Sequence, residues 1–209
     1  MSRGGPDSVV LTSIQALVSP GECEAGVSRL DATRRADRMR SIVAEHYASL
    51  WRFLRRLGVP EADVEDAAQK SLWVVAQRLD DVAPGKDKPF LFGVARRVAK
   101  TARRESRRRP GGEADERLDE LPSIGLDAGQ QLDERRARAL LDDLLASLPL
   151  DLRTVFVLYE LEELTMAEIA RALEMPMGTV ASRLRRAREE FEALSRRLRR
   201  ERVRKEGVR

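Results

Sequence analysis

The stretch LTMAEIARALEMPMGTVASRLRRAREEF, residues 164–191, decides the fold of the C-terminal part of this 209-residue chain. Thr165 and Glu168 have the Thr-x-x-Glu spacing of a capping box, which satisfies backbone amides at the start of a helix. Pro176 and Gly178 then interrupt the helical pattern, as a turn between two helices does. The stretch therefore has the sequence pattern of a helix-turn-helix, whose second helix enters the DNA major groove.

The second helix of this motif has an apolar stripe on one side and arginine on the other. Ser182, Arg185 and Arg186 point away from the stripe, and Arg183 lies on its flank. An arginine fork can bind phosphate oxygens or a guanine edge with two hydrogen bonds. An ordinary amphipathic helix with a solvated basic face has the same pattern, and that alternative stays open at this point. The stripe recurs at spacings of four, three, four and three and consists of Val180, Leu184, Ala187, Phe191 and Leu194.

Composition limits the classes of binding partner and the cellular compartment that we expect for this protein. The formal net charge is +4, with basic clusters at residues 96–109 and 183–204 and acidic clusters at 113–120 and 133–143. Two separate basic clusters predict a polyanion that is contacted at two places. One cysteine and one histidine exclude an internal disulfide and a Cys/His zinc site by count. No apolar run is long enough to span a bilayer. We expect a cytoplasmic protein with no metal, no cofactor and no membrane insertion.

Helical periodicity dominates and strand signals are few, so the sequence predicts an all-α protein. We expect two small helical domains joined by a flexible linker, the C-terminal one containing the helix-turn-helix. Aromatic residues concentrate before residue 95, which suggests a separate N-terminal core. Both ends of the chain are expected to be disordered and solvated, apart from a short helix near residues 8–18. The predicted parts are a mobile N-terminal extension (1–37), a first domain (38–109), an acidic linker (110–133), a helix-turn-helix domain (134–195) and a basic tail (196–209).

The first domain is predicted to contain three helices. The first ends before Gly58, the second runs over residues 61–79, and the third begins at Phe90 and runs to residue 109. A loop rich in Asp, Lys, Gly and Pro separates the last two at residues 80–89. The inward face of the second helix consists of Val64, Ala68, Leu72, Val75 and Leu79.

Two polar faces of these helices are candidate binding surfaces. The second helix places Asp63, Asp66, and Gln69 or Lys70 opposite its apolar stripe. Such a face can meet a basic partner or remain solvated, and the residues alone favour the solvated interpretation. The third helix carries cations that can neutralise phosphates, namely Arg96, Arg97, Lys100, Arg103 and Arg104.

Two segments carry a resemblance to a known family. The segment DVEDAAQ at residues 63–69 is similar to an Asp-x-x-Asp-x-x-Gln motif, and residues 148–188 are similar to a fourth-region helix-turn-helix pattern. On these segments the chain resembles the extracytoplasmic-function sigma factors of the bacterial sigma-70 superfamily, the promoter-recognition subunits of RNA polymerase. The resemblance covers about residues 39–109 and 140–194, in the family's order and with a linker between them.

The resemblance implies one role for each domain. The N-terminal domain would bind core RNA polymerase and open the minus-ten element of promoter DNA, with the loop at 80–89 receiving a flipped base. The C-terminal domain would read the minus-thirty-five element. The implied core-polymerase contacts are Asp63, Asp66, Gln69 and Lys70. The implied minus-ten contacts are Arg96, Arg97, Lys100, Arg103 and Arg104. The implied minus-thirty-five contacts are Thr179, Ser182, Arg183, Arg185 and Arg186.

The chain departs from the family pattern at several contact positions. Arg97 stands where relatives often have an asparagine that contacts promoter bases, and arginine prefers guanine edges and phosphates where asparagine prefers adenine. Lys70 replaces a frequent acid, and Ala181 replaces a common basic residue of the recognition helix. Phe90 stands where tryptophan is frequent, and we expect it to pack in the core. The minus-ten preference is therefore expected to differ from the common one.

The leading hypothesis is a sigma factor that is monomeric when free and catalyses no reaction. The sequence has no nucleotide-binding glycine loop and no Cys/His pair of catalytic type. Many relatives are held inactive by an anti-sigma factor, which makes such a partner a family expectation. One alternative is a stand-alone helix-turn-helix regulator that binds duplex DNA as a dimer, without polymerase. Another is a helical adaptor for acidic partners or membranes. Pro176, Gly178 and Thr179 argue against the adaptor, which needs no such turn.

Overall fold

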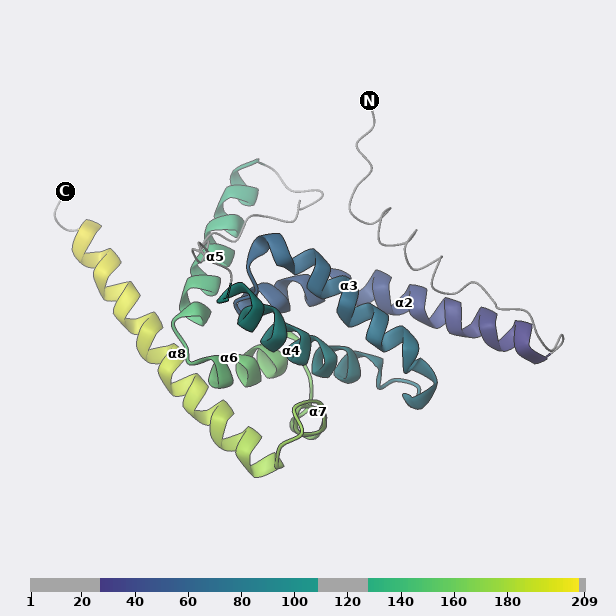
Figure 1. The fold of residues 1–209 in the computed structure, drawn as a ribbon. Helices are drawn as coiled ribbons and strands as arrows, with labels where there is room; N and C mark the ends of the chain where they lie inside the picture. The colour runs from purple at the N-terminus through teal and green to yellow at the C-terminus, as the bar shows by residue number, and fades with distance from the viewer. Residues whose placement is uncertain (1–26, 109–127, 207–209) are drawn as a thin grey trace.

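The computed structural model describes the backbone of residues 27–108 and 128–206, and the side chains of residues 32–108 and 136–200. Every regular element in these ranges is a helix or a helical turn (Figure 1), so the all-α prediction is confirmed. The short helix expected near residues 8–18 and most of the expected linker lie outside the described residues. The elements are α2 (Val27–Arg56), α3 (Glu61–Gln77), the 3-10 turn η1 (Leu79–Asp81), α4 (Asp87–Ser106), α5 (Ala128–Ala146), α6 (Leu150–Phe156), the π-helical turn η2 (Val157–Leu161), α7 (Met166–Ala172) and α8 (Met177–Glu206).

Helices α2, α3 and α4 pack together as an N-terminal unit. Gly58 has a φ of 80°, a left-handed conformation that favours glycine, and it turns the chain from α2 into α3. The rings of Phe53 and Phe92 meet edge to face with centroids 5.0 Å apart and join α2 to α4. All five residues predicted for the inward face of the second helix are buried. Phe90 is half-buried and packs against the same core, as expected.

Several helix ends differ from the predicted ones. Helix α2 begins at Val27, well before residue 38, and α4 begins at Asp87 rather than at Phe90. The loop between α3 and α4 is consequently shorter than predicted. Helix α8 continues to Glu206, so the expectation of a disordered end after residue 196 is wrong for most of that segment. Its run of Arg, Glu and Leu extends a helix that is already nucleated, and extension costs far less than nucleation.

The helix-turn-helix of the C-terminal unit consists of α7 and the start of α8. The capping box is confirmed: the Thr165 hydroxyl accepts from the Glu168 amide at 3.3 Å, and the Glu168 carboxylate accepts from the Thr165 amide at 3.1 Å. The turn itself differs from the prediction. Gly178 lies inside the first turn of α8, and the residue that reverses the chain is Glu174, which has a φ of 54°.

The two units do not have separate cores. Their buried apolar side chains form one continuous cluster, so the expectation of a separate N-terminal core is wrong. Helix α7 packs directly on α4 and lies below it in Figure 1. The backbones meet at Gly93, where a Cβ atom would lie 2.9 Å from the carbonyl oxygen of Ala172. Glycine at this position therefore permits the close approach of the two helices.

Candidate nucleic-acid interface

The start of α8 presents an open basic face. Ser182, Arg185 and Arg186 are exposed, and the stripe on the opposite side of the helix is buried from Val180 to Ala187, as predicted. Arg185 and Arg186 pair with glutamates one turn further on, at 2.6 Å and 3.6 Å. Exposed pairs of this kind contribute under about 1 kcal/mol. A phosphate or a base edge can therefore replace the glutamates.

The other two residues predicted for this surface are less accessible. The Arg183 guanidinium turns toward α6, where its Nε lies 3.6 Å from a carboxylate oxygen of Asp151. It also lies 3.8 Å from the sulfur of Met175. Thr179 is half-buried, and its carbonyl oxygen accepts from the Ser182 hydroxyl at 3.0 Å. The structure thus brings three of the five predicted residues onto one open face and holds Arg183 at its edge.

The five cations predicted on α4 do not share one surface. Three of them line a groove of about 320 Å³ between α4 and the C-terminal unit, and Arg183 lines the same groove. Arg97 instead pairs with Glu174 at 2.8 Å, and Arg104 is exposed. The three groove residues are Arg96, Lys100 and Arg103. Cations predicted to contact two distant promoter elements are thus neighbours in this structure.

The predicted polymerase-binding face lies on α3. Asp66 and Lys70 are both exposed and form an ion pair at 2.7 Å, and this hydrogen bond raises the pKa of Lys70. Lys70 therefore neutralises Asp66 instead of adding an unpaired cation. Asp63 lines a groove of about 380 Å³ between α3 and α4 together with this pair, whereas Gln69 is half-buried and is not one of the groove's lining residues.

An exposed tryptophan extends this face. Trp73 lies one turn after Lys70 and keeps 45% of its surface exposed. Trp73 was not predicted as a surface residue, because an aromatic residue in an amphipathic helix is usually part of the core. Its position offered a signal, since residue 73 falls outside the apolar stripe of that helix. An exposed indole beside charged side chains is typical of residues that anchor protein interfaces.

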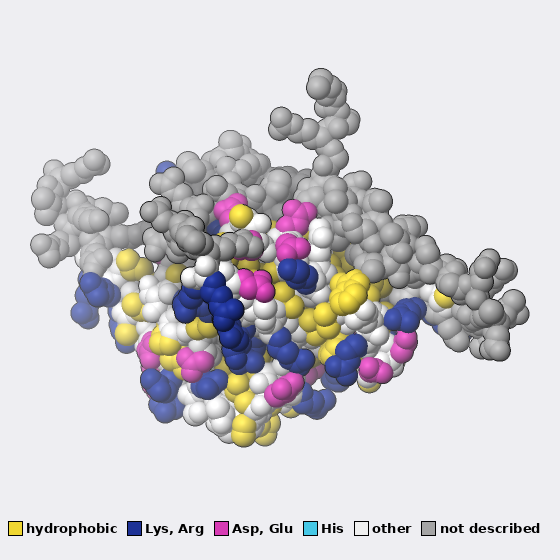
Figure 2. All heavy atoms as spheres, viewed as in Figure 1, with side chains coloured by type: hydrophobic (Ala, Val, Ile, Leu, Met, Phe, Trp, Pro, Cys, Tyr) yellow, Lys and Arg dark blue, Asp and Glu magenta, His cyan; other side chains and the backbone are white. Residues whose placement is uncertain are grey.

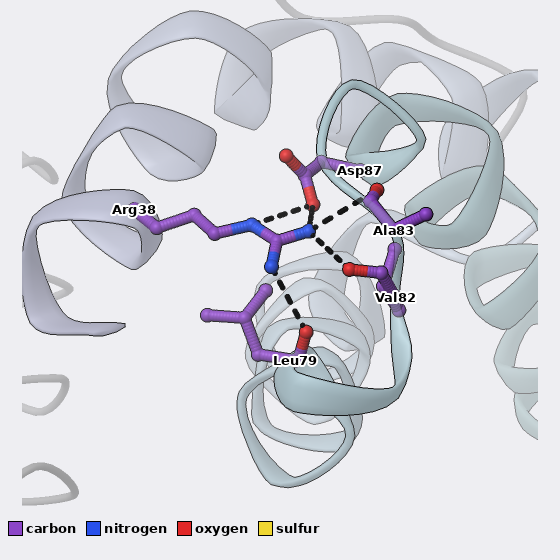
Figure 3. Close-up of polar contacts among 5 residues, drawn as sticks. All are labelled: Arg38, Leu79, Val82, Ala83 and Asp87. Carbon is purple, nitrogen blue, oxygen red and sulfur yellow. Dashed lines mark hydrogen bonds and ion pairs between the residues drawn. The ribbon is translucent and has the colours of Figure 1, made fainter. Parts of the chain in front are cut away.

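Arg38 fixes the segment between α3 and α4, as Figure 3 shows. Its guanidinium donates to the Asp87 carboxylate with Nε at 3.1 Å and with Nη2, and Nη1 donates to the carbonyl oxygen of Leu79 at 3.1 Å. Nη2 also reaches the carbonyl oxygens of Val82, at 2.7 Å, and Ala83, at 3.4 Å. One side chain of α2 thus holds the segment that leads into the basic helix. A single arginine within a helix gave no pattern from which this could be predicted.

The surface charge is mixed. Figure 2 shows Lys and Arg side chains spread over one face of the molecule with Asp and Glu side chains among them. Many of the described cations have an acidic neighbour, including Arg97, Arg183 and Arg185. Within the described parts of the chain, no helix is long and apolar enough to cross a bilayer, and no cluster of potential metal ligands occurs.

Comparison with known proteins places both units in one family. Residues 42–109 match Sigma-70 region 2, and residues 130–191 match Sigma-70, region 4. The chain is 34% identical over 145 residues to the ECF RNA polymerase sigma-E factor of Salmonella typhimurium, which covers 63% of this chain and 73% of the relative. It is 29% identical over 178 residues to the ECF RNA polymerase sigma factor SigE of Mycolicibacterium smegmatis, covering 83% of this chain and 69% of the relative.

A solved structure agrees in fold. The sigma factor RpoE of Bartonella quintana, in complex with the anti-sigma factor NepR, matches with a TM-score of 0.57 and 22% identity over 75% of this chain and 96% of that chain. These matches do not favour a stand-alone regulator that acts without polymerase. The chain belongs to the extracytoplasmic-function (ECF) RNA polymerase sigma factors of the sigma-70 family.

Proposed function

We propose that this sigma factor binds core RNA polymerase through α3 and contacts promoter DNA through α4 and α8. The observation that carries the proposal is the open face of Ser182, Arg185 and Arg186 on the second helix of a region 4 helix-turn-helix. This helix follows a region 2 unit whose α4 bears six cations, five of them the predicted DNA contacts. Two basic surfaces on two units suit one DNA molecule that is contacted at two places.

The minus-thirty-five contacts proposed for α8 are Ser182, Arg185 and Arg186 on the open face, with Thr179 and Arg183 at its edge. Arg185 and Arg186 can bind guanine edges or phosphates with two hydrogen bonds. The minus-ten contacts proposed for α4 are Arg96, Arg97, Lys100, Arg103 and Arg104. These cations suit the phosphates of a melted strand, for which each contact adds to the salt dependence of binding.

The proposed polymerase contact is the α3 face that carries Asp63, Asp66, Gln69 and Lys70, extended by Trp73. Two carboxylates beside an exposed indole suit a partner surface with a basic rim and an apolar pocket. We further propose that the chain acts as a monomer in the cytoplasm, where polymerase and DNA are found. Phosphodiester bond formation then belongs to the polymerase, and this chain supplies binding alone.

An anti-sigma factor is a proposed partner. The Bartonella quintana sigma factor is solved in complex with the anti-sigma factor NepR. We extend this mode of control to the present chain because the fold that NepR binds is shared. Copurification of the chain from its host, followed by identification of any bound protein that blocks core polymerase binding, would test this part of the proposal.

Transcription from a promoter library by the host's core polymerase, with and without the chain, tests the main proposal. Arg186→Ala is expected to lower initiation at promoters that depend on the upstream element by about 5- to 150-fold, the loss that one bidentate base contact gives. Arg196→Ala is the matched control, because Arg196 lies on the same helix and pairs with a glutamate one turn away at 3.2 Å. Equal losses in both variants would contradict the proposed reading face.

A second pair of substitutions separates the two surfaces. Asp66→Ala combined with Gln69→Ala should weaken core polymerase binding and leave the upstream DNA preference of any residual transcription unchanged. Arg186→Ala should do the reverse. Absence of promoter-specific initiation by the unmodified chain with its own host's polymerase would refute the whole assignment.

A further inference from the structure

The groove of about 320 Å³ that α4 lines carries an excess of positive charge. Four of its lining side chains are cations and one is an acid, so the lining has a formal charge of +3. The acid, Asp151, lies 3.6 Å from the Nε of Arg183 and is more than half exposed. It therefore neutralises at most one of the four. The cations are Arg96, Lys100, Arg103 and Arg183.

The three cations that α4 contributes are not paired with acids in the described part of the chain. Their neighbour Arg97 differs, because it pairs with Glu174 at 2.8 Å. The three groove cations follow one another at spacings of four and three and so lie on one side of the helix. Like charges at these spacings destabilise a helix. A bound anion would remove that cost.

The surroundings of Arg103 add to the positive potential. Burial and then the charge of Arg107 lower the pKa of Arg103. Burial and then the charge of Arg103 lower the pKa of Arg153. Guanidinium groups therefore repel one another here, in a place from which water is partly excluded. An anion interacts with such groups more strongly than with cations on the open surface, because the effective dielectric constant is lower.

Much of the remaining lining is apolar. Leu57 follows α2, Leu150 begins α6, and Leu173 and Met175 lie at the turn between α7 and α8. Leu57 and Leu173 are buried, whereas Leu150 keeps 37% of its surface exposed. Small-molecule sites typically combine apolar walls with a few polar groups that fix the orientation of the ligand. Arginine also stacks on aromatic rings. The groove thus suits a ligand with anionic groups at one end and a flat ring at the other.

Size and charge narrow the class of ligand. A volume of about 320 Å³ is at the lower end of the range for small-molecule sites. One phosphate group carries about −1.5 to −2 charges at pH 7, so two of them match the lining. We propose that the groove is a binding site for a nucleoside polyphosphate. Its phosphates accept hydrogen bonds from Arg96, Lys100 and Arg103, and its base lies against Leu150 and Met175.

A ligand at this site competes with DNA. The three α4 cations are also proposed contacts of the melted minus-ten strand, so this consequence rests on the proposed function. Binding of the nucleotide itself does not, because it requires neither polymerase nor DNA. By linkage, each ligand lowers the affinity for the other by the same factor.

Calorimetric titration of the full chain in 0.15 M salt tests the site, with guanosine 5′-diphosphate and adenosine 5′-diphosphate as probes. We expect one saturable site with a Kd below about 1 mM, the upper end of the usual range for cellular substrates. Guanosine should not bind measurably, and inorganic pyrophosphate should bind about 10-fold more weakly because it buries no apolar surface. Absence of saturable binding by both nucleotides would overturn the proposal, as would equal affinity for pyrophosphate.

Substitutions locate the bound probe. Lys100→Gln removes one groove cation at an exposed position and should weaken nucleotide binding by about 10-fold. Arg104→Gln is the matched control, because Arg104 is exposed on the same helix and does not line the groove. It should change the Kd by less than about 3-fold. Circular dichroism checks that both variants are folded. Equal weakening would mean that the probes bind the basic surface in general, which overturns the groove.

The apolar wall has a test of its own. Leu150→Ser should weaken binding of the nucleotides and leave binding of pyrophosphate unchanged, a difference that general loss of structure does not produce. Equal weakening for nucleotide and pyrophosphate would contradict the placement of the base.

Displacement of a labelled DNA single strand from the free chain tests the competition. Guanosine 5′-diphosphate should displace the strand at the concentrations that fill the calorimetric site. A strand that binds and is not displaced would overturn the shared site. If no strand binds in the first place, the proposed contact of α4 with DNA loses its support, and the calorimetric result still stands by itself.

Discussion

Replacement of Arg38 by alanine is expected to loosen the segment that leads from α3 into the basic helix α4. The guanidinium joins α2 to the Asp87 carboxylate at the start of α4 and to the carbonyl oxygens of Leu79, Val82 and Ala83. The segment contains few apolar side chains that could hold it otherwise, apart from Leu79 and Val82. Its conformation thus depends on one side chain from a distant part of the sequence.

The size of the effect follows from burial. A hydrogen bond with a charged partner contributes about 1.5–3 kcal/mol when water cannot replace it. The Arg38 and Asp87 side chains are 27% and 20% exposed, so water partly replaces the lost bonds. We therefore expect Arg38→Ala to lower the free energy of unfolding by about 2–3 kcal/mol. Lysine would recover less than half of this, because one ammonium group cannot reach both the carboxylate and the carbonyl oxygens.

Urea unfolding of the full chain, followed by circular dichroism, measures this difference. Arg40→Ala is the control, because Arg40 lies on the same helix and, among the residues that the structure describes, pairs with Asp37 one turn earlier, at an exposed site. It should cost less than about 0.5 kcal/mol. If the two variants unfold at the same urea concentration, Arg38 does not hold the segment and the reasoning is refuted. Promoter opening should also slow in Arg38→Ala, whereas upstream DNA binding should not change.

Three further substitutions test single groups. Burial raises the pKa of Glu162 above its usual value of 4.5. Between these two pKa values the folded state binds more protons than the unfolded chain. The free energy of unfolding therefore falls as pH rises through that range. Glu162→Gln should remove this dependence, as measured by urea unfolding at pH 5 and pH 7. Lys86 and then Thr165 lower the pKa of Glu168 to about 2, so its contribution is present above pH 4.5 and is lost as pH falls toward 2. Thr165→Ala should cost about 1 kcal/mol at neutral pH and weaken that acid dependence, again by urea unfolding. Arg97→Asn should move the minus-ten preference from guanine toward adenine in promoter selection and leave polymerase affinity unchanged; an identical selected sequence would contradict the proposed base contact.

Features that depend on neighbouring residues could be predicted from the sequence. The capping box of Thr165 and Glu168 needs only a spacing of three, and the buried stripe that begins at Val180 needs only the helical period. The exposure of Arg185 and Arg186 follows from the same period, since the face opposite a buried stripe must point to solvent. The division into two helical units also follows from local signals, because helix breakers and changes in composition mark where each unit ends.

Partners from distant parts of the sequence could not be predicted. Arg38 reaches a carboxylate 49 residues away, and Arg97 reaches one 77 residues away. Nothing near Arg97 in the sequence indicates an acidic partner, so it looked like an unpaired cation available for DNA. The turn of the helix-turn-helix was misplaced for a related reason. Of the two residues predicted for the turn, Pro176 lies in it, whereas Gly178 lies inside α8. The left-handed conformation in the turn is adopted by Glu174, which pairs with Arg97 of α4.

Gly93 shows that a local irregularity can still indicate a distant contact. A glycine in the middle of a helix costs about 1 kcal/mol relative to alanine, and here it stands on the apolar side of α4, where a larger side chain would add to the core. From the sequence alone, Gly93 indicates only a position of low helix propensity. In the structure the missing Cβ is what allows the backbone of Ala172 to approach.

Glu174 pairs with Arg97 from a conformation that non-glycine residues rarely adopt. Gly93 and Glu174 each cost conformational free energy in their own helix or turn, and both lie on the contact between α4 and the helix-turn-helix unit. Such a local cost is expected where a sequence specifies a contact between domains.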